Sequence, residues 1–358
     1  MRKTLVILTP GFPENEADTT CIPERQIFVR VLKETYPELN IVVVSFQYPN
    51  QPREYRWNGI KVIALGGKNR SGLHRRMTWI GAWQKLKRLH SDYQVIGLLS
   101  FWFDECAFIA NKFSKKYTIK HYSWLLGQDA RPDNKYVQQI KPEGDSLIAL
   151  SEYLVNEFEK NYGITPKHVI PGAIDTTLFK APPAQRDIDV LAVGSLIPLK
   201  QYHLFIETVK FLKEFYPNIT AVICGKGIEM QKLKDLTALY RLGDNITFKG
   251  ELTHPEILEH MQRSKILLHP SSYEGFSTVL LEALYAGAHV VSFFRPMKEA
   301  FSHHHVVNNV DEMNAKTLAL LNDEDRGHEP VLVNSMTQMA DSIVNLFSNE
   351  LHKEAAMS

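Results

Sequence analysis

Two glutamates, Glu274 and Glu282, enclose a short segment whose residue types suit anion binding. The apolar run that ends near His269 predicts a strand, and the run from Ser277 to Gly287 predicts a helix with a glycine stop. A helix N-terminus attracts negative charge and offers backbone N–H groups, here from Gly275, Phe276, Ser277 and Thr278. Carboxylates beside such a site accept hydrogen bonds from sugar or ribose hydroxyls. Taken alone, the segment also fits an ordinary strand, loop and helix with two surface glutamates.

Short apolar runs alternate with amphipathic segments, which is the pattern of a parallel sheet covered by helices. In the first half the expected strands are Thr4–Thr9, Asn40–Phe46, Lys61–Leu65, Gln94–Ser100, Thr118–Tyr122 and Ser146–Leu150. In the second half they are Asp189–Val193, Thr220–Cys224, Asn245–Phe248, Ile266–His269 and His289–Phe293. The proline-rich segment Ala181–Gln185 is the expected linker. The sequence therefore predicts an α/β protein with two Rossmann-like, doubly wound domains facing each other across a cleft, with ligands beyond the carboxyl ends of the strands.

Six segments occur in an order that resembles a known family. The longest, ILLHPSSYEGFSTVLLEALYAGAHVV from Ile266, contains the two glutamates. The others are LIALSEYLVNEF from Leu147, VIPGAIDTTLF from Val169, VLAVGSLIPLK from Val190, VICGKGIEM from Val222 and NITFKGELTHPEIL from Asn245. Together they resemble the family-4 retaining glycosyltransferases, the glycosyl transferases group 1, which have the GT-B fold. The resemblance implies an acceptor-side domain over residues 1–180 and a donor-binding domain over 187–334. It also implies a C-terminal helix, within 335–358, that packs back on the first domain.

The resemblance assigns roles to individual residues. Lys200 matches the lysine that contacts the donor diphosphate, where a cation offsets the charge that develops on the leaving group. Glu274 matches the residue that contacts the transferred sugar, and Glu282 matches the one that holds the ribose hydroxyls. Further donor-binding positions are implied at Ser195, Gly225, Gly227, Gly250, Leu252, Gly275, Phe276, Ser277 and Thr278. Catalysis is expected to involve Glu274, Lys200 and Asp129, and Gly11 is expected on the acceptor side.

The chain departs from the family pattern at two places. Ser195 stands where the family commonly has a second diphosphate-binding arginine, whose charge-assisted contact is worth roughly 1.5–3 kcal/mol. Leu126-Gly-Gln-Asp129 replaces the family's His-Gly-x-Asp, so the histidine is absent while Asp129 remains. Asp129 also fits a simple turn or N-cap carboxylate. In the same domain, Trp102 and Asp104 follow a predicted strand, where packing is the favoured role.

The composition is that of a globular protein, with 44% hydrophobic and 23% charged residues in 358. Three scattered cysteines and the lack of a long apolar run favour the cytoplasm. The net charge of +1 hides an asymmetry, because residues 1–180 hold 25 Lys and Arg against 18 Asp and Glu. Part of that excess surrounds Trp79, Trp83 and Leu86. This segment is either a basic helix with aromatic anchors resting on the inner face of an anionic membrane, or a solvated helix whose tryptophans enter the core.

Two metal motifs are weak. Asp187-Ile-Asp189 precedes a predicted strand, whereas a phosphate-bound metal should follow one, and His303-His-His305 fits a solvated loop. We therefore expect a metal-independent, retaining transferase that needs no cofactor and moves a hexosyl-type sugar from a nucleotide-diphosphate donor to a saccharide or lipid-linked glycan. The alternatives are a related GT-B phosphorylase or epimerase, a metal-dependent transferase that uses Asp187 and Asp189, and a non-catalytic sugar-nucleotide binding protein. No nucleic-acid motif accompanies the basic segment.

Overall fold

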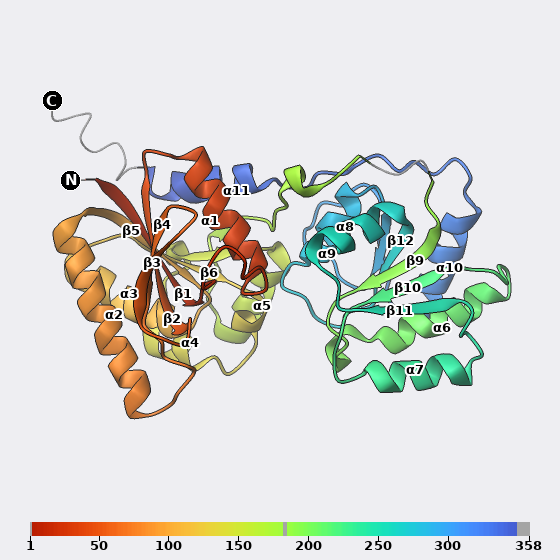
Figure 1. The fold of residues 1–358 in the computed structure, drawn as a ribbon, viewed down its shortest axis with the longest axis horizontal. Coiled ribbons are helices and arrows are strands. Elements are labelled where there is room, and N and C mark those ends of the chain that lie inside the picture. Colours follow the sequence, from red (N-terminus) through yellow and green to blue (C-terminus); the bar gives the residue numbers. More distant parts are fainter. Residues whose placement is uncertain (1, 182–184, 349–358) are drawn as a thin grey trace. The chain divides into compact units, whose positions relative to one another are not determined.

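The computed structural model describes residues 2–181 and 185–348, which form two compact units (Figure 1). The N-terminal unit comprises Met1–Pro171 and Met336–Ser358, and the C-terminal unit comprises Gly172–Ser335. Residues 182–184 of the expected linker and 349–358 of the expected C-terminal segment lie outside the described residues.

The N-terminal unit is built on a sheet of eight strands in the order β3-β4-β2-β1-β5-β6-β7-β8. Only the edge strand β3 runs antiparallel to its neighbour. The strands are β1 (Lys3–Gly11), β2 (Asn40–Tyr48), β3 (Arg53–Trp57), β4 (Ile60–Ala64), β5 (Gln94–Phe101), β6 (His121–Leu125), β7 (Leu147–Ala149) and β8 (His168–Val169). The central strands β1, β2 and β5 are mostly buried, and their sequences are rich in apolar residues, as is typical of parallel sheets covered on both faces.

Helices cover both faces of this sheet (Figure 1). The longer ones are α1 (Pro23–Thr35), α2 (Leu73–Asp92), α3 (Glu105–Tyr117) and α5 (Glu152–Tyr162), and α4 (Lys135–Ile140) is short. On one face, α2 and α3 share a core with residues of β1 and β2 such as Val6 and Val42. No described helix has the length and apolar character needed to cross a membrane.

The tryptophans of α2 point into the core, so the prediction of aromatic membrane anchors is wrong. The ring of Trp79 lies 5.1 Å from that of Phe108, and its Nε1 donates a hydrogen bond to Glu105 over 2.5 Å. Trp83 packs edge-on against Phe113 at 5.2 Å. The second interpretation, a helix whose tryptophans enter the core, agrees with these contacts.

The last described helix, α11 (Met336–Leu346), belongs to the N-terminal unit and packs on α1. The hydroxyl of Tyr36, which follows α1, donates to Asp341 over 2.6 Å. Phe347 is fully buried, with its ring 5.1 Å from that of Tyr122. The division of the N-terminal unit falls after Pro171, before the predicted limit at residue 180. The reason is that Ile174 pairs with Ser335 inside the C-terminal unit.

The C-terminal unit contains a fully parallel sheet of six strands in the order β11-β10-β9-β12-β13-β14. They are β9 (Ile188–Val193), β10 (Ala221–Cys224), β11 (Ile246–Gly250), β12 (Ser264–His269), β13 (His289–Ser292) and β14 (His304–Val306). Its helices are α6 (Tyr202–Lys213), α7 (Met230–Leu239), α8 (His254–Arg263), α9 (Thr278–Tyr285) and α10 (Val310–Asn322). Alternate residues of β9 enter two cores, one shared with α6 and the other with α9.

Three expectations for the strands need correction. Thr118 is not in a strand, because it ends α3 in the left-handed conformation with φ 54°, and β6 starts only at His121. The edge strands β3 and β8 were not expected, since their short and partly exposed sequences carry little pattern. The histidine run His303–His305 is not a solvated loop, because His304 and His305 belong to β14 and pair with β13.

Candidate functional site

The loops at the carboxyl ends of β9, β10 and β11 are joined by backbone hydrogen bonds. The N–H of Gly194 donates to Cys224 over 3.0 Å, and that of Gly225 donates to Gly250 over 2.7 Å. The N–H of Leu196 reaches Lys226 over 2.9 Å. Because of these hydrogen bonds, the turns that follow three neighbouring strands form one continuous surface. Ligands of parallel α/β proteins bind at this edge of the sheet.

Glycine is required in these turns by close backbone packing. A Cβ atom on Gly225, which has φ +145°, would lie 1.9 Å from the carbonyl oxygen of Gly194. One on Gly227 would lie 2.2 Å from the carbonyl oxygen of Leu196. The family resemblance implied donor-binding positions at both glycines. The structure adds a reason for glycine itself, which is contact between one loop and the next.

Lys200 and Glu274 form an ion pair within this surface, and both side chains are mostly buried. The imidazole of His269, the last residue of β12, also contacts Glu274, with Nε2 3.0 Å from Oε1. Burial alone would raise the pKa of the Glu274 carboxyl. The contacts with His269 and Lys200 outweigh burial and lower the pKa to about 2. Glu274 is therefore a carboxylate at neutral pH, held between two groups that can carry positive charge.

The loop that carries Glu274 is fixed to the loop that carries Lys200. Both the N–H and the hydroxyl of Ser272 donate to the carbonyl oxygen of Leu199, over 3.0 and 3.1 Å. After Glu274 the chain enters α9, with Ser277 at its N-cap position, as the sequence predicted. The structure thus brings the Lys200 turn, Glu274 and the start of α9 together.

Glu282, in α9, is buried and contacts a histidine that sequence reasoning missed. His254 Nε2 lies 2.6 Å from Glu282 Oε1. This contact raises the pKa of His254, although partial burial of the imidazole opposes the effect. His254 opens α8, directly after Thr253. Only the capping box of Thr253 and Glu256 was visible in the sequence, and it gives no sign of a contact with α9.

The remaining predicted donor-binding residues are also in the C-terminal unit. Ser195 is exposed in the turn after β9, and its short side chain supplies no positive charge. Leu252 and Phe276 pack against the core shared with α9, which ties their loops to the unit. These residues lie in the C-terminal unit, which is the unit predicted to bind the donor. Their roles in donor binding remain predictions.

Asp129 and Gly11, the predicted residues of the other unit, lie near strand ends of the N-terminal sheet. Asp129 is 3% exposed, and its Oδ2 accepts a hydrogen bond from the N–H of Leu126 over 2.8 Å. Burial raises its pKa to about 7, and the same cause raises that of Asp104 to about 7. Asp104 is the N-cap residue of α3, where its side chain accepts a hydrogen bond from the N–H of Cys106, a structural role within the unit. Gly11 ends β1, and a Cβ there would meet only Cys21 and Tyr48 at ordinary distances.

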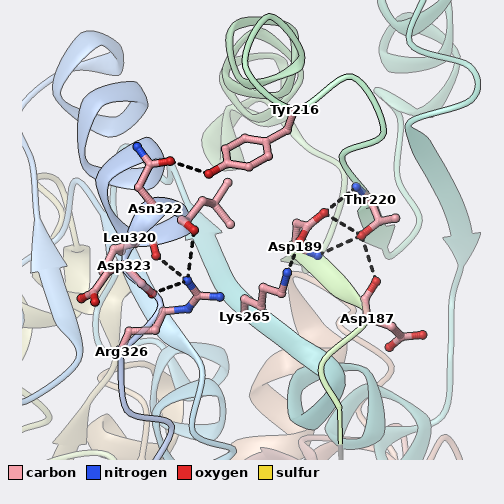
Figure 2. Close-up of polar contacts among 10 residues, drawn as sticks. Asp187, Asp189, Tyr216, Thr220, Lys265, Leu320, Asn322, Asp323 and Arg326 are labelled. Atoms are coloured by element: carbon pink, nitrogen blue, oxygen red, sulfur yellow. Dashed lines mark hydrogen bonds and ion pairs between the residues drawn. The ribbon is translucent and has the colours of Figure 1, made fainter.

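Asp187 and Asp189 are engaged by protein groups at the amino end of β9. Figure 2 shows Asp189 accepting hydrogen bonds from Thr220 and pairing with Lys265, whose Nζ lies 2.6 Å from Oδ1. Asp187 pairs with Arg263, with Nε 2.9 Å from Oδ1. Among the described residues, no group of three or more His, Cys, Asp or Glu side chains has the geometry to hold a metal.

The histidines of β13 and β14 form a stacked cluster at the edge of the C-terminal sheet. His289 Nδ1 lies 3.1 Å from His305 Nε2, and the two rings stack at 5.4 Å. His303 stacks on the same ring at 4.3 Å. Burial lowers the pKa of His305 to about 4, and burial also lowers the pKa of His289.

Comparison with known proteins bears on the family and the fold of the chain. Residues 174–332 match the family described as Glycosyl transferases group 1. The C-terminal unit is a glycosyltransferase group 1 domain. The glycogen synthase of Mycobacterium tuberculosis is 29% identical over 178 residues, which are 48% of this chain and 43% of that protein. The chain thus matches less than half of that relative's length.

The fold of the whole chain is that of known GT-B glycosyltransferases. Sucrose-phosphate synthase from Thermosynechococcus elongatus matches 100% of this chain and 98% of its own, with a TM-score of 0.70 and 15% identity. Anabaena Alr3699/HepE, solved in complex with UDP-glucose, matches 99% of both chains with a TM-score of 0.65 and 14% identity. At such identity the likeness concerns the fold alone, and it confirms two Rossmann-like domains of the GT-B type.

Proposed function

We propose that the protein transfers a hexosyl-type sugar from a nucleotide-diphosphate sugar to a saccharide or lipid-linked glycan. The observation that carries the proposal is the arrangement of Lys200, Glu274 and Glu282 around the start of α9. A cation and two buried carboxylates beside a helix N-terminus match the charges of a nucleotide sugar. Its diphosphate is anionic, while its sugar and ribose carry hydroxyl donors.

Each group takes one part of the donor. Lys200 binds the diphosphate and offsets the negative charge that grows as the bond from the anomeric carbon to the phosphate oxygen breaks. Glu274 accepts hydrogen bonds from the transferred sugar, and Glu282 accepts them from the ribose. The acceptor oxygen forms the new bond to the anomeric carbon, its proton passes to the leaving phosphate, and a nucleoside diphosphate departs. Retention of configuration rests on the family resemblance, and no metal or cofactor enters this scheme.

A purified-protein assay tests the proposal. Nucleotide-linked sugars with different bases are screened by thermal shift, because a ligand of the native state raises the midpoint in a concentration-dependent way. Release of the nucleoside diphosphate is then followed with and without a chelator. We expect one donor to bind, E282A to lose that shift, and turnover to persist in chelator. Absence of binding by every nucleotide sugar would contradict the proposal, and loss of activity in chelator would support the metal-dependent alternative.

A second candidate is a sugar-nucleotide binding protein without activity. This candidate is favoured because Ser195 and Leu126 stand where the family commonly has an arginine and a histidine. Donor binding without turnover or donor hydrolysis would support it. A matched variant, S195R, separates the two. Restored charge should increase turnover in a weak transferase, whereas it should only tighten binding in a non-catalytic protein.

We further propose that the N-terminal unit contacts an anionic membrane in the cytoplasm, through α2. Leu73, Met77 and Ile80 are 74%, 68% and 57% exposed and occur at helical spacing. The exposed basic residues Arg76 and Lys87 lie on the same helix.

A pocket of about 480 Å³ lies between α2 and the segment after β4. Its lining includes Ile63, Leu65, Arg70, His74 and Met77. Apolar side chains beside cations suit the boundary between lipid chains and anionic headgroups.

A further inference from the structure

The N-terminal unit contains a buried cation without an acceptor. Arg25, in the first turn of α1, is 4% exposed. In the part of the chain that the structure describes, its guanidinium makes no hydrogen bond or ion pair. It stacks instead on Trp124, 4.2 Å from the ring centroid, and approaches Phe101 at 5.4 Å. Stacking involves only the flat face of the guanidinium group, and its five N–H donors, which lie in the plane of the group, remain unused.

A second unused donor belongs to the same stack. The indole Nε1 of Trp124, which is fully buried in β6, has no hydrogen-bond partner among residues 2–181 and 185–348. Phe28 closes the cluster from α1, 5.0 Å from the Trp124 ring. Buried polar groups in native proteins are normally paired, and a buried unpaired charge is especially costly. Arg25 and Trp124 thus place unused donors side by side in the described part of the N-terminal unit, and the charge of Arg25 interacts with that of the preceding residue, Glu24.

Two half-buried arginines of the C-terminal unit donate to backbone carbonyl oxygens, although Nε of Arg326 has no partner among the described residues. Arg186 donates to the carbonyl oxygens of Ser264 and Ala286, over 2.5 and 2.6 Å. Arg326 donates to three carbonyl oxygens, among them that of Leu320 over 2.6 Å (Figure 2). These two arginines act as structural donors inside the protein. In the described part of the chain, the guanidinium of Arg25 instead contacts two aromatic rings and no carbonyl oxygen within hydrogen-bond distance.

The location of Arg25 suits a ligand. It follows β1 and its loop, and Trp124 is at the end of β6, so both residues are at the carboxyl edge of the parallel sheet, where ligands bind in this class of fold. The positive end of the α1 dipole adds to the charge of the guanidinium. An anion with two oxygen atoms would meet the planar fork of the arginine and neutralise it.

We propose that Arg25 binds a phosphate or carboxylate group of the acceptor substrate. That the bound anion belongs to the substrate that receives the sugar rests on the proposed function. The anion site itself does not depend on that function. A guanidinium fork recognises both groups through a pair of oxygen atoms, and the indole N–H of Trp124 offers a further donor nearby. The acceptor is then an anionic saccharide or glycan rather than a neutral one.

The test measures anion binding by the full chain without any donor. Thermal unfolding is followed against inorganic phosphate and, separately, acetate, at constant ionic strength set with chloride. All proteins carry K200Q, which removes the cation of the donor site. R25M is compared with R30M, a control on the same helix whose exposed side chain lies 4.0 Å from Glu34. R25K keeps the charge but loses the fork.

We expect saturable stabilisation by at least one anion in the K200Q protein and in R30M, with affinity reduced at least tenfold in R25M. Without anion, R25M should unfold at the same temperature or higher, because it removes an unpaired buried charge.

A response to phosphate alone identifies a phosphate group, and a response to acetate alone identifies a carboxylate. Equal affinity in R25M and R30M, or no saturable response to either anion, would overturn the proposal. If R25M does not fold, R25K decides, since wild-type affinity there contradicts recognition by the fork. None of these results depends on sugar transfer, so failure of the proposed function would be seen separately in the donor screen.

Discussion

Lys200 and Glu274 form an ion pair in the C-terminal unit, with side chains 18% and 14% exposed. This contact occupies the cation that the donor diphosphate would use. If Lys200 binds the donor diphosphate as proposed, donor binding exchanges the carboxylate of Glu274 for phosphate oxygens on Lys200. The exchange also frees Glu274, which is held as a carboxylate, to accept hydrogen bonds from the sugar.

The first prediction concerns this exchange and uses E274Q. The variant should bind a nucleoside diphosphate about 3- to 10-fold more tightly than wild type, because Lys200 no longer has to leave a charged partner. The same variant should transfer sugar more slowly, because the amide is a weaker acceptor for sugar hydroxyls than the carboxylate. Calorimetric titration measures the first effect, and release of the diphosphate measures the second. D187N, which breaks an exposed pair at the other end of β9, is the control. Weaker nucleotide binding by E274Q would show that the ion pair does not compete with the ligand.

The second prediction is a pH dependence of stability. The pKa of His254 is raised from 6.5 by its contact with Glu282, so the folded state holds the proton more tightly than the unfolded state. The stabilisation is present in full below pH 6.5 and is lost as the pH rises through the raised pKa. Because the imidazole is partly exposed, the effect should stay below about 1 kcal/mol.

Chemical denaturation at pH 6 and pH 9 measures this difference in wild type and in H254Q. We expect the variant to lose the part of the pH dependence that belongs to the pair. H260Q, which changes a half-buried histidine on the same helix, should behave like wild type. An unchanged pH profile in H254Q would mean that the contact with Glu282 does not shift the proton equilibrium.

The sequence predicted most of the parallel strands and the strand, loop and helix around Glu274, whereas the donor-binding roles remain predictions. Buried strands such as β1 and β9 are apolar runs that can be recognised from the local sequence alone. The loop from His269 to α9 is bounded by the end of one such run and by the start of a helical pattern. Contacts between distant segments could not be predicted. His254 and Glu282 are 28 residues apart in sequence, and the pairing of β14 with β13 turns a polar histidine run into an edge strand.

The tryptophans of α2 illustrate the same limit. Helical spacing shows that Trp79, Trp83 and Leu86 share one side of the helix, but it does not show whether that side faces the core or the solvent. The contact of Trp79 with Glu105 on α3 decides this question. The same holds for Arg25, whose aromatic surroundings come from β5 and β6.

The third prediction tests the packing of the glycine turns. G225A should destabilise the C-terminal unit by about 2 kcal/mol or more, because the added methyl group would collide with the backbone of Gly194 and because φ is positive. G243A is the matched control, since a Cβ at Gly243 meets nothing within 4 Å. Urea denaturation, followed by a probe in the C-terminal unit, compares the two variants. Similar stability of G225A and G243A would show that the loops move apart at little cost.

The last prediction concerns the exposed apolar residues of α2. The triple variant L73S/M77S/I80S should bind vesicles containing anionic phospholipid at least tenfold more weakly than wild type, because each lost side chain removes apolar area that would enter the interface. Cosedimentation with vesicles at low salt measures the affinity. L239S removes a side chain that is 73% exposed in the C-terminal unit and should leave binding unchanged. Raising the salt should weaken the wild-type protein as well, because the basic residues of α2 lose their attraction to the headgroups. If wild type ignores anionic vesicles, or if L239S weakens binding as much as the triple variant, α2 is not the membrane contact.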